Sequence, residues 1–153
     1  MRRISVMKGS ASVMKKAIII FISLLLIFSI LSNVSFAAST KVKVSVNLKS
    51  IECVKNNHVG NEWGFGCTVN KMSLDEEDTI EIETTSNGKI TIVCRATEDD
   101  SIPDTGSKTL TIPVSKLKAG ESKTYTSQVT VKENRGRYSG NTAVWKFTFD
   151  VKR

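Results

Sequence analysis

Apolar side chains recur at every second position in most segments after residue 40, and this period constrains the fold more than any other feature. The clearest example is the run at 89–97, where more polar neighbours alternate with Ile90, Ile92, Cys94 and Ala96. A period of two is typical of a β-strand that buries one face. The same period recurs at 41–48, 63–69, 79–83, 110–114, 122–132 and 143–151. Short strands with turn residues between them predict an all-β fold, a single antiparallel β-sandwich of about seven to eight strands.

Two local signals refine this strand pattern. The apolar phase changes from even to odd positions after the first segment, which predicts a β-bulge near 49–50. Asn87 and Gly88 lie between two alternating segments, and Asn-Gly is a strong signal for a two-residue turn. We therefore expect a hairpin that pairs 79–85 with 89–97.

Residues 1–37 have the composition of a secretory signal peptide. Five basic residues precede an apolar run at 17–31, and small residues place the cleavage site after Ala37. An uncleaved anchor is the alternative, but the run is shorter than the roughly 20 residues of a spanning helix. A well-formed signal peptide also begins at Met14, so translation could start there as well as at the first residue. We expect a secreted or cell-surface domain at 38–153 that is not an integral membrane protein once cleaved.

The net charge gives little reason to expect a nucleic-acid partner. The whole chain carries +7, from 22 basic and 15 acidic residues. Five basic residues and no acidic residue fall in the predicted signal peptide, which leaves 17 basic and 15 acidic residues, or +2. The basic character belongs largely to the export signal, so it is not the footprint of a protein that binds nucleic acid.

The predicted domain has three cysteines, Cys53, Cys67 and Cys94. Export makes oxidation plausible, and an odd number allows one internal disulfide with one thiol left over. Cys53 and Cys67 flank the first turn in the inward phase, so we expect these two to pair. Cys94 shares the phase and could replace either partner. The spacing of the cysteines and of the single histidine does not fit a structural zinc site.

Four acidic residues stand where the strand at 89–97 ends: Glu98, Asp99, Asp100 and Asp104. Crowded carboxylates at one end of a sheet suit Ca²⁺, which takes six to eight oxygen ligands in flexible geometry. We expect these four residues to be the ligands, with Glu62 as an outer one. The alternative is a solvated turn in which Asp99 and Asp104 accept hydrogen bonds from backbone amides.

The segment CRATEDDSIPDTGSKTLTIPVSKLKAGE, within 89–121, resembles the calcium-loop region of a C2-type β-sandwich. In both, a strand ends in spaced acidic residues, a further aspartate precedes a glycine, and an amphipathic strand leads to a Leu-Lys-x-Gly-type turn. The resemblance implies a C2-like sandwich with Ca²⁺ bound at one loop end.

A glycine-punctuated basic loop precedes the last strand and contains Arg135, Arg137 and Tyr138. Arginine forks match phosphate and sulfate groups, so Arg135 and Arg137 are candidate anion-binding residues. The alternative is that this loop pairs internally with the acidic cluster.

Three aromatic residues, Trp63, Phe65 and Trp145, have two interpretations. They could form a platform that stacks on a sugar if exposed, but their inward phase favours the core.

The sequence offers no catalytic set, because a Ser/His/Asp or Cys/His arrangement would depend on His58 alone. We therefore expect a secreted or cell-surface, non-enzymatic binding module, stabilised by Ca²⁺ at the 98–104 loop. Its partner would be an anionic surface, a lipid headgroup or another protein. The alternatives are a small secreted toxin or antimicrobial effector, and a structural envelope protein.

Overall fold

The computed structural model describes residues 39–153. The elements of this part follow in the order β1 (Lys41–Asn56), β2 (Trp63–Val69), β3 (Met72–Ser73), β4 (Thr79–Thr85), β5 (Lys89–Glu98), β6 (Asp104–Pro113), the short 3-10 helix η1 (Val114–Lys116), β7 (Ser122–Lys132) and β8 (Thr142–Lys152). The predicted signal peptide and its cleavage site lie outside the described residues. No helix within 39–153 is long and apolar enough to cross a membrane.

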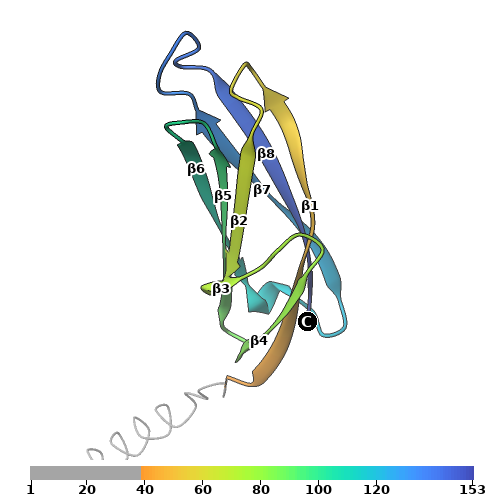
Figure 1. The fold of residues 1–153 in the computed structure, drawn as a ribbon. Coiled ribbons are helices and arrows are strands. Elements are labelled where there is room, and N and C mark those ends of the chain that lie inside the picture. The colour runs from red at the N-terminus through yellow and green to blue at the C-terminus, as the bar shows by residue number, and fades with distance from the viewer. Residues whose placement is uncertain (1–38) are drawn as a thin grey trace, which may run out of the picture. The chain divides into compact units, whose positions relative to one another are not determined.

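The strands form two four-stranded antiparallel sheets, so the prediction of an all-β sandwich is confirmed. One sheet has the order β4-β1-β8-β7 and the other the order β3-β2-β5-β6. Figure 1 shows the two layers packed face to face. The chain crosses between the sheets after β1, β3, β4 and β6, while β5–β6 and β7–β8 are hairpins within one sheet.

The expected hairpin between 79–85 and 89–97 is wrong. A turn does form there, with the Gly88 amide donating to the Thr85 carbonyl at 2.8 Å. However, β4 pairs with β1 in one sheet, and β5 pairs with β2 and β6 in the other. The Asn-Gly sequence determines the turn but not the strand that β4 pairs with. β4 pairs instead with the first half of β1, from Lys41 to Asn47. The turn therefore carries the chain from one sheet to the other.

The core fills the space between the sheets with alternate residues of each strand. The side chains of Ile90 and Ile92 on β5 and of Phe147 and Phe149 on β8 are fully buried. Burial of one such side chain contributes about 1.5–3 kcal/mol. The register of β1 against β8 shifts between Leu48 and Ser50, which confirms the predicted bulge. A second shift follows between Cys53 and Lys55.

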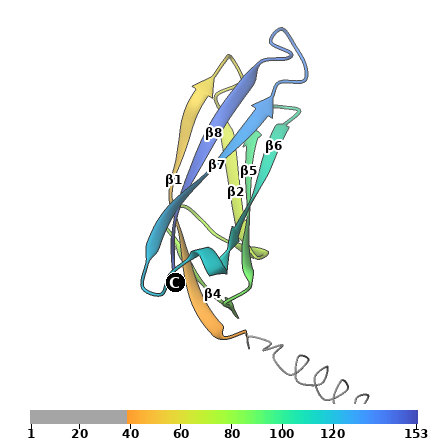
Figure 2. The ribbon, with the colours of Figure 1, turned by 180° about the vertical axis from the view of Figure 1, so that it is seen from behind.

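The connections of the described domain divide between its two ends. The turns β1–β2, β5–β6 and β7–β8 lie together at one end, as both Figure 1 and Figure 2 show. Arg153 and the start of β1 lie at the opposite end. The acidic and the basic loops singled out in the sequence therefore share one end of the sandwich.

The three cysteines are free thiols in the structure, so the expected Cys53–Cys67 bond is not formed. Cys53 is exposed on β1, where it lies opposite Trp145, while Cys67 is buried on β2 of the other sheet. The alternation in the sequence predicts that Cys53 faces the core, but the residue is exposed. Cys94 is buried on β5, directly opposite Cys67.

Candidate functional site

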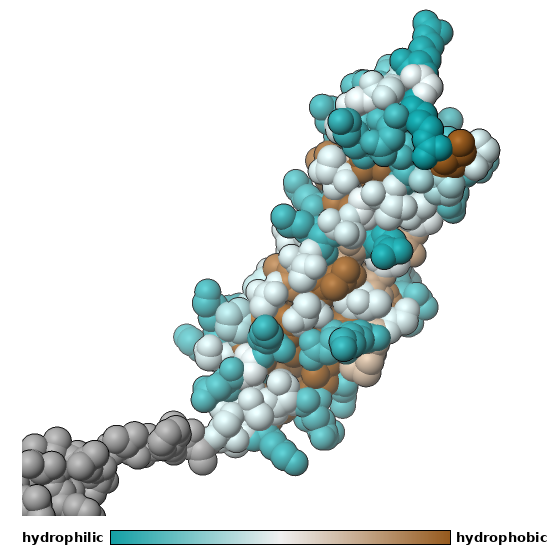
Figure 3. Space-filling model, turned by 90° about the vertical axis from the view of Figure 1, so that its left-hand side faces the viewer, coloured by the Kyte–Doolittle hydropathy of each residue, from teal (hydrophilic) through white to brown (hydrophobic). Residues whose placement is uncertain are grey.

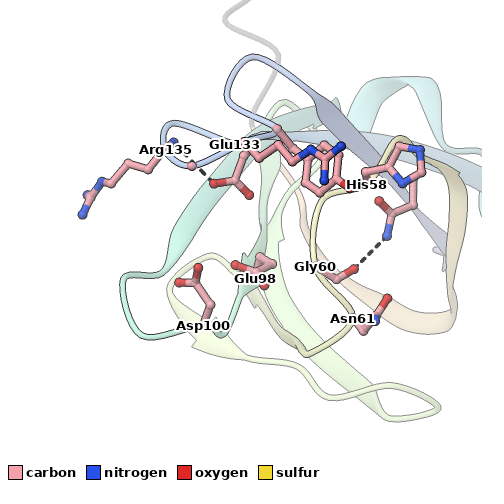
Figure 4. A pocket seen from close by; sticks show the side chains of 11 residues that line it. His58, Gly60, Asn61, Glu98, Asp100, Glu133 and Arg135 are labelled. Carbon is pink, nitrogen blue, oxygen red and sulfur yellow. Dashed lines mark hydrogen bonds between the residues drawn. The ribbon is translucent and has the colours of Figure 1, made fainter.

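The three loops at one end of the sandwich border an open cavity of about 600 Å³. Its lining comes from all three connections and consists of Asn56, His58, Gly60, Asn61, Glu98, Asp100, Glu133, Arg135, Gly136, Arg137 and Tyr138. Figure 4 shows Glu98 and Asp100 side by side on one wall, with the Glu133 side chain facing them from the β7–β8 loop. Both predicted sites therefore contribute to one cavity.

Two of the predicted ligands, Glu98 and Asp104, are direct cross-strand partners on β5 and β6. Both side chains are almost completely buried, with exposed fractions of 4% and 5%. Asp104 therefore belongs to a strand, and the loop itself is only 99–103. Like charges opposite each other on one sheet face repel, so this pair needs compensating partners.

Asp104 has such a partner in Asn134. The Asn134 backbone amide donates to one carboxylate oxygen at 3.1 Å, and its side-chain amide donates to the other at 2.5 Å. The side-chain hydrogen bond from Asn134 lowers the pKa of Asp104 against the opposing effect of burial. Since both oxygens already accept hydrogen bonds, Asp104 holds the β7–β8 loop, and it does not line the cavity.

Glu98 has weaker compensation, from a hydrogen bond of the Asp100 backbone that lowers its pKa. Its Oε2 atom is buried and accepts no hydrogen bond. Burial raises the pKa of Glu98, and the negative charges of Asp100 and Glu133 raise it further. The side chain packs against Gly60, where an added Cβ would collide with the Glu98 carboxylate. Glycine at position 60, with a φ of +37°, thus leaves the space that Glu98 occupies.

The remaining acidic residues of the prediction separate. Asp100 lines the cavity, and its Oδ1 atom accepts a hydrogen bond from the Ile102 amide at 2.7 Å. Asp99 lies beside Gly64, where an added Cβ would stand 3.1 Å from Asp99 Oδ2. Asp99 does not line the cavity. Glu62 is exposed and meets Asp99 only through its backbone carbonyl, which accepts from the Asp99 amide. The sequence-predicted ligand set is therefore split between the cavity and its surroundings.

Glu133 is the acidic residue that sequence reasoning missed. It is half-buried directly after β7, lines the cavity, and accepts a hydrogen bond from the Arg135 amide at 3.3 Å. A signal did exist, because Glu133 stands between the strand that ends at 132 and the basic loop. Grouping Glu133 with the acidic residues would have required knowing that the β7–β8 turn lies at the same end as the β5–β6 turn.

Arg135 and Arg137 form the basic side of the cavity. Neither Arg135 nor Arg137 takes part in the four ion pairs found within 39–153. The guanidinium of Arg137 lies 5.8 Å from the ring centre of Tyr138, which is within cation–π range. Tyr138 also stacks on His58, with ring centres 5.2 Å apart. Arg135 extends away from Glu98 and Asp100 (Figure 4).

The three aromatic residues of the sequence analysis form a cluster between β2 and β8. The rings of Trp63 and Phe65 lie 5.1 and 4.6 Å from that of Trp145. Trp63 and Trp145 are half-buried against the core, while Phe65 keeps 41% of its surface exposed. The cluster is a margin of the core, and only Phe65 presents a substantial aromatic surface.

Among residues 39–153, no group of three or more His, Cys, Asp or Glu side chains stands close enough to hold a metal ion as placed. The residues with the right chemistry for a cation are Glu98, Asp100 and Glu133, which share the cavity without meeting at one point. Comparisons with protein-family models and with curated proteins found no match for this chain.

Proposed function

We propose that this protein is a secreted or cell-surface, non-enzymatic binding module that docks on an anionic lipid surface through a cation held at its three-loop end. The observation that carries this proposal is the buried Oε2 atom of Glu98, which has no hydrogen-bond partner in a cavity shared with Asp100 and Glu133. A buried acceptor without a partner costs free energy, and a bound cation would remove that cost.

Ca²⁺ is the cation that fits this donor set best. It accepts carboxylate oxygens in irregular arrangements and does not require fixed octahedral geometry. Carboxylates that share a cavity repel one another, and a cation bound between them would offset this repulsion. Glu98, Asp100 and Glu133 would supply the protein ligands, in place of the set at 98–104 that the sequence predicts.

The surroundings of the cavity favour a lipid headgroup as the anionic partner. Arg135 and Arg137 are free of ion pairs within the described domain and lie on the same rim. Two loops also present apolar or amphipathic side chains, with Ile102 exposed by 48% and Tyr138 by 43%. Figure 3 shows only small apolar patches along one face of the domain, within a largely hydrophilic surface. Contact through the loop tips suits this distribution better than contact through a sheet face.

The first experiment is a thermal melt of the purified protein with Ca²⁺ or with a chelator. We expect millimolar Ca²⁺ to raise Tm by several degrees, since a ligand bound only by the folded state stabilises it. The paired substitution Glu98→Gln and Glu133→Gln should abolish the shift. Glu83→Gln is the matched control, because Glu83 is exposed on β4 and pairs with Lys43 at the start of β1, at the end of the domain opposite the cavity. Equal melts with Ca²⁺ and chelator would refute the cation.

The second experiment separates a lipid surface from free phosphate. We expect the protein to sediment with phosphatidylserine vesicles in Ca²⁺, and to remain in solution with phosphatidylcholine vesicles or with chelator. Arg137→Ala should reduce the bound fraction severalfold. Competition by millimolar inorganic phosphate, without any vesicle binding, would reassign the site to a soluble anion. Growth inhibition of other cells, or oligomers that increase with concentration, would favour the effector or the envelope alternative.

A further inference from the structure

Cys67 and Cys94 lie directly opposite each other on the neighbouring strands β2 and β5. Both face the core, with exposed fractions of 4% and 0%. The neighbouring Cys94 thiol and burial raise the pKa of Cys67. The two sulfur atoms are therefore neighbours in the folded protein, unlike Cys53, which is exposed on the other sheet.

The backbone hydrogen bonds define the geometry of this pair. The Asn70 amide donates to the Thr91 carbonyl, so Asn70 and Thr91 form a hydrogen-bonded pair. Such pairs alternate with non-hydrogen-bonded pairs along an antiparallel ladder. Cys67 and Cys94 are three positions further along, an odd number, and thus form a non-hydrogen-bonded pair. The direction of the Cys67 carbonyl is consistent with such a pair, because it points away from β5 and accepts a hydrogen bond from the Leu74 amide.

Side chains approach most closely in pairs of this type. The two Cα atoms of a non-hydrogen-bonded pair are about 4.5 Å apart, and disulfides span Cα separations of about 4.4–6.8 Å. A bond can therefore form between β2 and β5 without moving either backbone far. Cys53 and Cys67 are not cross-strand partners, because β1 and β2 belong to different sheets.

We propose that Cys67 and Cys94 form the disulfide of the exported protein and that Cys53 is its free thiol. The oxidant is a small-molecule or protein disulfide met outside the cytoplasm. One cysteine thiolate attacks that disulfide, forms a mixed disulfide and releases one thiol. The second cysteine thiolate then attacks the mixed disulfide, so that the Cys67–Cys94 bond forms and the second thiol leaves. The cysteines lose two electrons and two protons, and one disulfide is reduced to two thiols.

Burial determines when this reaction takes place. In the folded domain neither sulfur is accessible to an oxidant, so exchange occurs before β2 and β5 are fully packed. Once formed, the bond joins β2, which follows the loop that contains Gly60, to β5, which ends at Glu98. It would fix the two neighbouring strands beside the contact between Gly60 and Glu98.

The test maps the disulfide in the purified protein after refolding from denaturant with reduced and oxidised glutathione. Free thiols are alkylated, and the protein is digested with trypsin without reduction. Cleavage after lysine and arginine places the three cysteines in separate peptides, 50–55, 56–71 and 90–95. We expect 56–71 to be linked to 90–95, and 50–55 to carry the alkyl group.

Melting gives a second readout. We expect the oxidised protein to melt about 10 °C above the protein kept in reductant. Cys53→Ser should retain this difference, while Cys67→Ser and Cys94→Ser should lose it. If either variant fails to fold, the peptide map of the unsubstituted protein still decides. A linked peptide that contains Cys53, or three alkylated cysteines after oxidative refolding, would overturn the proposal whatever the result with Ca²⁺ or lipid.

Discussion

The inner faces of the two sheets differ between the middle of the sandwich and its three-loop end. In the middle, the inward positions of β5 hold Ile90, Ile92, Cys94 and Ala96, all fully buried. At the loop end the same alternation continues, but the inward position is Glu98, and its cross-strand partner is Asp104. The strand period therefore continues to the cavity, and only the residue type at the inward position changes, from apolar to acidic. Such a local departure from a stable pattern is typical of functional sites.

The largest effect should come from the middle of the sandwich. Phe147→Ala removes a fully buried ring and leaves a cavity, so we expect the free energy of unfolding to fall by about 3–5 kcal/mol. Phe65→Ala is the matched control, because Phe65 contacts Phe147 but is partly exposed, and it should cost less than about 2 kcal/mol. Urea unfolding of both variants measures the difference. Equal losses would contradict the contrast between the core and its margin.

A smaller loss should follow at the acidic end from Asp104→Ala. The substitution leaves the two Asn134 donors without their acceptor, so we expect a loss of about 1–3 kcal/mol. The β7–β8 loop should loosen at the same time, which faster amide exchange at Asn134 would detect. Unchanged exchange would show that other contacts hold this loop.

The smallest effect should have the opposite sign. Glu98→Gln removes a buried negative charge beside Asp100 and Glu133, so in the absence of Ca²⁺ we expect stability near pH 7 to rise by about 1 kcal/mol. The measurement is Tm in chelator, with Glu83→Gln as control. A fall in Tm would mean that the Glu98 charge is already compensated in the folded protein.

The two buried carboxylates should give stability opposite dependences on pH. The folded-state pKa of Glu98 is raised above 4.5, so its contribution favours the folded state at low pH and is lost as pH rises from 4.5 through the raised pKa. The pKa of Asp104 is lowered below 3.8, so its contribution is present above pH 3.8 and is lost as pH falls through the lowered pKa. The measurement is Tm from about pH 2 to about pH 8. The fall in Tm above pH 4.5 that Glu98 causes should disappear in Glu98→Gln, and the fall below pH 3.8 that Asp104 causes should disappear in Asp104→Asn.

The sequence predicted the strands well because the apolar period is a local property. It predicted the β1 bulge for the same reason, since a change of phase is visible without any partner strand. Pairing was harder, because the Asn87-Gly88 turn is compatible with a hairpin and with a crossing between sheets. The choice depended on β1, which lies far away in sequence.

The sequence singled out part of the lining of this cavity. Glu98 and Asp100 do line the cavity, and Arg135 and Arg137 lie at the same end. The sequence could not show that Asp104 accepts hydrogen bonds from Asn134, because this contact depends on two hairpins meeting. Glu133 was missed for the same reason. Residues brought together by topology cannot be grouped from spacing along the chain alone.

The pairing of β1 with β8 has a consequence for the timing of folding. These are the first and last strands of the described domain, and they lie side by side in the middle of one sheet, with ladder contacts from Ser45 to Asn56. Until β8 has been synthesised, β1 has only β4 to pair with, and half of its length has no neighbour in its sheet. Contacts between such distant segments slow folding. In a nascent chain of this topology, the central pairing of this sheet cannot form until the last strand has emerged.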